Sequence, residues 1–97
     1  MSVSELFKDT RLPVIAAPLF IISYPELVIA QCKAGVIGSF PALNARPAEE
    51  LEKWIIKISS ELEKYKKDNP NEIVSPFAVN QICHGSNDRL EHDVDVC

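Results

Sequence analysis

Short apolar runs alternate with amphipathic stretches along this chain. Three runs are almost continuously apolar, as strands buried on both faces of a parallel sheet are: Pro13–Pro18, Val36–Phe40 and Ser75–Ile82. Each run is followed by a segment with apolar residues every three or four positions, as on one face of a helix: Pro25–Ala34, Pro47–Asp68 and Asp88–Cys97. The pattern predicts three strand–helix units in succession.

Helix boundaries have signals of their own. Ser2 with Glu5, and Ser23 with Glu26, have the spacing of capping boxes, which predicts a short helical turn near the start and a helix from Pro25. Gly35 stands where a helix ending at Ala34 needs its left-handed residue. The clearest apolar stripe lies in the second long helix, and we expect it to be core: Leu51, Trp54, Ile55, Ile58, Leu62 and Tyr65.

This order predicts an α/β fold with a parallel sheet and right-handed crossovers. The last helical pattern places Leu90, Val94 and Cys97 on one face, and it has no glycine cap and no polar segment after it. We therefore expect residues 1–97 to be one domain that is incomplete at its carboxyl end.

Composition narrows the class of protein. With 97 residues, 46% hydrophobic, 25% charged and only 3 glycines, the chain is predicted to fold, as one domain at most. A net charge of −4 argues against a nucleic-acid surface or a polybasic membrane anchor. The apolar run Leu12–Ile22 contains two prolines and is too short to span a membrane. Three cysteines, an odd number, argue against a disulfide framework, so a cytoplasmic location is expected.

Candidate chemistry is confined to the loops after the strands, where parallel sheets bind ligands. These loops are apolar or amide-rich, which suits a flat, neutral ring better than a metal or a phosphate. Asn80 stands where a buried strand needs Val or Ile, so either a ligand or neighbouring backbone must satisfy its amide. Cys83 and His84 are interpreted as a loop thiol and a solvent-facing imidazole, and His92 as solvated. Glycines only at 35, 38 and 85 cannot form a phosphate-binding loop.

Four segments, in order, resemble the nitronate monooxygenases, formerly called 2-nitropropane dioxygenases. The first, Leu12–Phe20 followed by Ser23-x-Pro25-Glu26-Leu27, resembles the opening of that family. The others resemble its second strand and loop, the start of its second barrel helix and its third strand: Lys33–Asn44, Ala48–Leu51 and Phe77–Asn80. The resemblance covers nearly the whole chain.

The resemblance implies the first three βα units of an FMN-dependent TIM (β/α)8 barrel that oxidises alkyl nitronates with O2. It places the backbone of Ala17, Pro18 and Leu19 against the isoalloxazine edge and gives Asn80 a hydrogen bond to the flavin. Leu19, where the family usually has Met, and Gln81 depart from its pattern. His84 does not match the motif of the family's catalytic histidine, so no catalytic residue is assigned and the 97-residue chain alone is expected to be inactive.

Two other interpretations stay open. The FMN-containing enoyl reductases of fatty-acid synthesis open with a similar barrel, although they usually have a Gly-Gly pair where this chain has Ala17-Pro18. A non-catalytic α/β interaction module, acting through an exposed core, is the third. Flavin binding by a longer product is expected for the two enzyme families and not for the interaction module.

Overall fold

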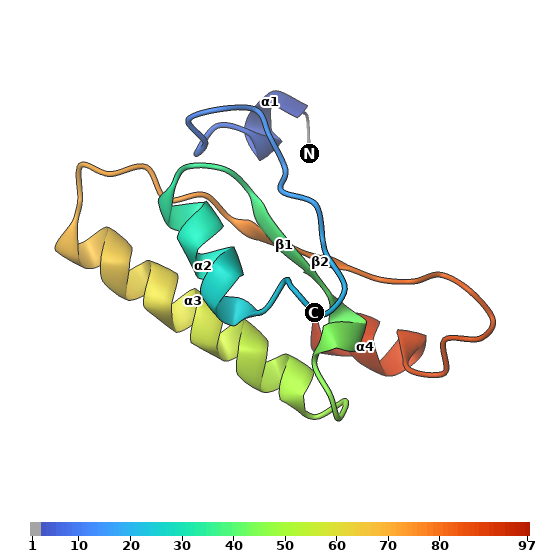
Figure 1. Ribbon diagram of the computed structural model, residues 1–97. Coiled ribbons are helices and arrows are strands. Elements are labelled where there is room, and N and C mark those ends of the chain that lie inside the picture. Colours follow the sequence, from blue (N-terminus) through green and yellow to red (C-terminus); the bar gives the residue numbers. More distant parts are fainter. Residues whose placement is uncertain (1–2) are drawn as a thin grey trace.

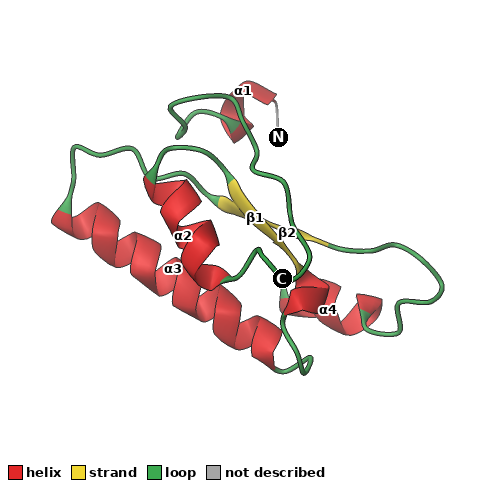
Figure 2. Ribbon diagram, in the orientation of Figure 1, coloured by secondary structure: helices red, strands yellow, loops and turns green. Residues whose placement is uncertain are grey.

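Four α-helices, two strands and a single turn of 3-10 helix succeed one another in the computed structural model, which describes residues 3–97 (Figure 1). In chain order they are α1 Val3–Leu6, α2 Pro25–Lys33, β1 Gly38–Pro41, η1 Ala42–Asn44, α3 Glu50–Asp68, β2 Phe77–Asn80 and α4 Leu90–Val96. Together they form a small mixed α/β domain around a two-stranded parallel sheet (Figure 2).

The two strands confirm two of the three predicted runs as strands, with different bounds, and β1 is buried as predicted. The predicted burial of the last run on both faces is wrong, because residues 77–79 are half-buried and Asn80 is exposed. β1 and β2 pair in parallel from Gly38 with Phe77 to Pro41 with Asn80. Parallel pairing requires a crossover, and α3 provides it, as the alternation of strand and helix patterns predicts. The α/β class and the parallel sheet are therefore as expected.

The predicted strand Pro13–Pro18, buried on both faces, is wrong. Only Ile15 forms a bridge, opposite Ile37, the residue before β1, with two hydrogen bonds: Ala16 N–H to Ile37 O (2.8 Å) and Ile37 N–H to Val14 O (3.1 Å). The bounding prolines have no N–H to extend the ladder. Ile15 is 50% exposed, because no described element covers this side of it.

The core lies between the sheet and the α2–α3 pair, which packs on it (Figure 1). Phe40 of β1 is fully buried, with its ring centroid 5.5 Å from that of Trp54 and 6.5 Å from that of Phe77. Leu51 and Ile58, from the predicted stripe of α3, are also fully buried. Burial of such side chains contributes roughly 1.5–3 kcal/mol each, so this one-sided core supplies most of the stability.

Helix boundaries agree in part with the predictions. α2 begins at Pro25 and α3 ends at Asp68 as expected, and Gly35 has the left-handed φ of +93°. The Ser23–Glu26 capping box is wrong, since Tyr24 is the N-cap residue and makes no side-chain cap. In the first capping box, Ser2 lies outside the described residues, and the turn that follows is α1.

α4 buries a different face from the one predicted. Asp93 is fully buried and Val96 packs against the core, whereas Val94 is 52% exposed. The reason is an ion pair of Asp93, described below, which fixes the rotation of this short helix. Within residues 3–97, no helix combines the length and apolar character needed to cross a membrane.

Candidate functional site

The predicted site residues follow parallel segments of the chain at their carboxyl ends. Ile15 pairs with Ile37, and Pro41, at the end of β1, pairs with Asn80, at the end of β2. The backbone pairing of the first segment does not continue past Ala16, and Leu19 N–H binds the Ser23 hydroxyl instead. Ala17, Pro18 and Leu19 therefore lie in the loop after the first segment, and Asn80 ends β2.

The loop after the first segment is held by the buried side chain of Asn44 in η1. The Asn44 amide donates to Leu19 O (3.1 Å) and Ser23 O (3.0 Å), and its oxygen accepts from Ile21 N–H (3.3 Å). The Ser23 hydroxyl oxygen, buried, accepts from Leu19 N–H at 2.7 Å. These four hydrogen bonds to the Asn44 and Ser23 side chains hold loop 19–23, which makes no backbone hydrogen bond to β1 or β2.

Because of these contacts, the three positions predicted to present backbone groups to a ligand differ: Ala17, Pro18 and Leu19. Both polar groups of Leu19 are occupied, since its N–H binds Ser23 and its carbonyl accepts from Asn44 and from Ser23 N–H. The N–H of Ala17 and the carbonyls of Ala17 and Pro18 make no hydrogen bond with the described residues, and both residues are exposed. Ala17 and Pro18 can therefore offer backbone groups to a ligand, and Leu19 only its side chain.

Asn80 ends β2 with its side chain exposed. That side chain makes no hydrogen bond with residues 3–97, so neighbouring backbone does not satisfy its amide. The expectation that this amide is buried is wrong, because Asn80 is exposed and water can satisfy its hydrogen bonds. The need for either a ligand or a backbone partner therefore disappears.

The loop after β2 behaves as expected at Cys83 and His84. Both are exposed, and His84 Nδ1 lies 2.8 Å from the Ser86 hydroxyl and accepts from Ser86 N–H at 3.1 Å. No group of three metal-ligating side chains occurs within residues 3–97. His92, expected to be solvated, is half-exposed, but its Nδ1 lies 2.9 Å from Asp93 Oδ1.

α4 is tied to η1 by Arg89, which the sequence analysis does not identify. Its guanidinium donates to Ala45 O (2.8 Å) and Ala42 O (3.3 Å) and pairs with Asp93, with Nε 3.2 Å from Oδ2. Asp93 is fully buried, so the arginine both neutralises a desolvated carboxylate and caps the carbonyls around η1. η1 is thus hydrogen-bonded to loop 19–23 through Asn44 and to the start of α4 through Arg89.

The resulting edge has a definite chemical character. It presents free backbone groups at 17 and 18, one free amide at 80 and exposed apolar side chains, among them Leu19 and Phe20. These groups can contact a flat ring and hydrogen-bond its edge. Among the glycines, Gly38 packs closely against Val28 O and Cys32, whereas Gly85 lies in open space.

Comparison of the chain with models of known protein families, with curated proteins and with solved structures gives no match to any of the three.

Proposed function

We propose that this chain is the amino-terminal part of an FMN-dependent (β/α)8 barrel of the nitronate monooxygenase type. The observation that carries the proposal is the register at the sheet edge. Three parallel segments lie in chain order, 14–16, β1 and β2, so Ala17 and Pro18 follow the first of them and Asn80 ends the last. Sequential parallel segments with ligand groups at their carboxyl ends are the arrangement of such barrels.

The residues present fit the ring of FMN. Ala17 and Pro18 would hold one edge of the ring with their free backbone groups, and Asn80 would donate or accept at another edge of it. When bound, FMN accepts electrons from the substrate and passes them to O2. The chain's own residues would orient the ring and exclude water from it through the apolar side chains of loop 19–23.

The described residues offer no group suited to the phosphate of FMN. The solvent-accessible surface area is also larger than expected for a closed domain. A folded protein of 97 residues exposes roughly 5,500 Å², whereas this chain exposes 6278 Å². Many of the exposed large apolar side chains lie on the first segment and the loop after it. They are Leu12, Val14, Ile15, Leu19, Phe20, Ile21 and Ile22, each at least 45% exposed. Later units of a barrel would cover these side chains and supply the phosphate loop.

The test begins with the reading frame beyond the codon for Cys97. We expect it to continue with further strand–helix units, and the longer product to purify with oxidised flavin absorbance and to consume O2 when an alkyl nitronate is added. In that product, Asn80→Val should weaken flavin retention about tenfold, the effect of one lost hydrogen bond to a buried partner. The control is Asn71→Val, a change of an exposed turn residue. A longer product that is colourless and gains no absorbance with added FMN would overturn the proposal.

A non-catalytic interaction module is the second candidate, favoured by the same exposed apolar side chains. Loop 19–22 presents four consecutive large apolar residues, from 45% to 68% exposed, and contiguous patches of this kind mark interaction surfaces. This function predicts that neither the 97-residue chain nor a longer product binds flavin. The flavin titration therefore decides between the two.

A further inference from the structure

A small cavity opens between loop 19–23, the turn after η1 and α3. Its volume is about 140 Å³, and its walls are Phe20, Ile21, Tyr24, Asn44, Arg46 and Trp54. Water occupies about 30 Å³ per molecule, so the cavity holds a molecule of roughly five non-hydrogen atoms. It is too small for a flavin, although Phe20 and Ile21 of its wall belong to loop 19–23, which the site proposed above also uses.

The one charged side chain in the wall is Arg46. Its guanidinium carbon lies 5.1 Å from the centroid of the Phe20 ring, which holds it over the cavity mouth. Its Nε donates to Leu43 O at 3.1 Å, while its two terminal nitrogens make no hydrogen bond or ion pair with residues 3–97. Arg46 thus offers a planar pair of charged donors, the geometry that binds a carboxylate with two parallel hydrogen bonds.

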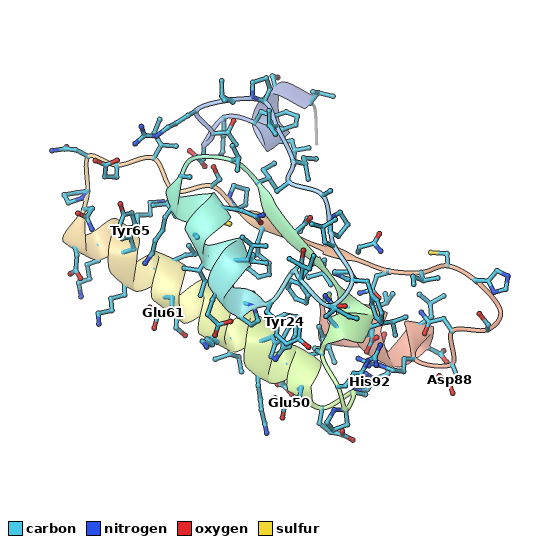
Figure 3. The ribbon with its side chains drawn as sticks, viewed as in Figure 1. Tyr24, Glu50, Glu61, Tyr65, Asp88 and His92 are labelled. Atoms are coloured by element: carbon cyan, nitrogen blue, oxygen red, sulfur yellow. The ribbon has the colours of Figure 1, made fainter. Side chains whose placement is uncertain are left out.

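Two aromatic residues complete the wall. Tyr24, at the start of α2, faces α3 (Figure 3), and its ring centroid lies 4.9 Å from that of Trp54. The Tyr24 hydroxyl and the Trp54 indole N–H make no hydrogen bond with the described residues. No carboxylate lines the cavity, and the Asn44 amide is already fully used by the loop.

We propose that this cavity binds a small aliphatic carboxylate of about three carbons. The carboxylate group pairs with the terminal nitrogens of Arg46, and the short alkyl chain lies against Tyr24 and Trp54. The proposal does not depend on flavin binding, because the contacts to the carboxylate are assigned to Arg46, Tyr24 and Trp54, none of which belongs to the proposed flavin site.

The experiment uses Trp54, the single tryptophan of the chain, as an internal fluorophore. The 97-residue protein is titrated with sodium propanoate at constant ionic strength, and parallel titrations use propanamide, which has the same shape without the charge, and sodium chloride. We expect a saturable change in Trp54 emission with propanoate at millimolar concentration. Propanamide and chloride should give none.

Two variants locate the site. Arg46→Met should raise the half-saturating propanoate concentration about tenfold or more, since a charge-assisted bidentate contact is lost. Arg11→Met removes the same charge from an exposed arginine at the other end of α2, where Arg11 pairs with Glu72, and it should leave the titration unchanged. Circular dichroism checks that both variants fold. An equal response to propanamide, a non-saturating response, or an unchanged titration in Arg46→Met would each overturn the proposal.

Discussion

Replacement of Asn44 by alanine tests whether one buried amide fixes the loop at the sheet edge. The change removes three hydrogen bonds, to Leu19 O, Ser23 O and Ile21 N–H. Each contributes about 1 kcal/mol net, and a buried group left without a partner costs about 1–3 kcal/mol. Ser23 is fully buried, whereas Leu19 and Ile21 are exposed enough to regain water. The expected loss of unfolding free energy is therefore about 3 kcal/mol.

The assay is thermal unfolding followed by Trp54 fluorescence. For a domain of this size, about 3 kcal/mol corresponds to a fall in Tm of roughly 10–20 °C. Loop 19–23 should also become susceptible to chymotrypsin, which cleaves after Phe20 when the loop opens. Asn71→Ala, in an exposed turn, is the matched control and should change stability by less than about 0.5 kcal/mol.

A second variant separates the loss of the bonds from the loss of volume. Asn44→Asp keeps the size and the oxygen that accepts from Ile21, but it aims a charged oxygen at the carbonyls of Leu19 and Ser23. It should destabilise the protein at least as much as Asn44→Ala at neutral pH, because a charge is buried beside two acceptors. If Asn44→Ala loses less than about 0.5 kcal/mol, or Asn44→Asp is the milder change, loop 19–23 is not held through this amide.

Two further predictions concern α4 and the thiols. Arg89→Met should lower the free energy of unfolding by about 3–5 kcal/mol in urea, because it leaves the fully buried Asp93 carboxylate without its cation, and Lys57→Met, at an exposed ion pair, should change it by less than about 1 kcal/mol. Equal effects of the two would refute a buried pair. At neutral pH an aromatic disulfide reagent should modify exposed Cys83 first and Cys97 more slowly, since burial raises the pKa of the Cys97 thiol. Cys32, whose pKa burial also raises, should react only in denaturant, and rapid labelling of all three thiols in the folded protein would contradict its burial.

The elements that were predictable from sequence are those whose signals are local. The apolar stripe of α3 repeats over 19 residues, so a helix in any compact fold must bury it, and Leu51 and Ile58 are buried. Gly35 ends α2 because its left-handed backbone suits a residue without Cβ. Both inferences need only the residues of the element itself.

The errors arise where the outcome depends on distant parts of the chain. Apolar composition shows that the run 13–18 can be buried, but burial needs a covering layer, which residues 3–97 do not provide. Ser23 has the spacing of a capping residue, yet its hydroxyl accepts from Leu19 N–H, since the loop turns back on itself there. Asn80 is an amide in an apolar run, which is locally unusual, but its exposure at the end of β2 depends on the same missing layer.

Asn44 and Arg89 had no comparable local signal, and together they explain why the edge is ordered. An amide in a loop and an arginine before a helix are ordinary in sequence; only the fold brings both to η1. A three-residue turn thereby connects the loop after the first segment to the start of α4, across the carboxyl end of β1. A ligand that contacts loop 19–23 from either side acts on groups already fixed by these bonds, so little loop entropy is lost on binding. That preorganisation is a property of the turn, and it would favour binding at either of the two proposed sites.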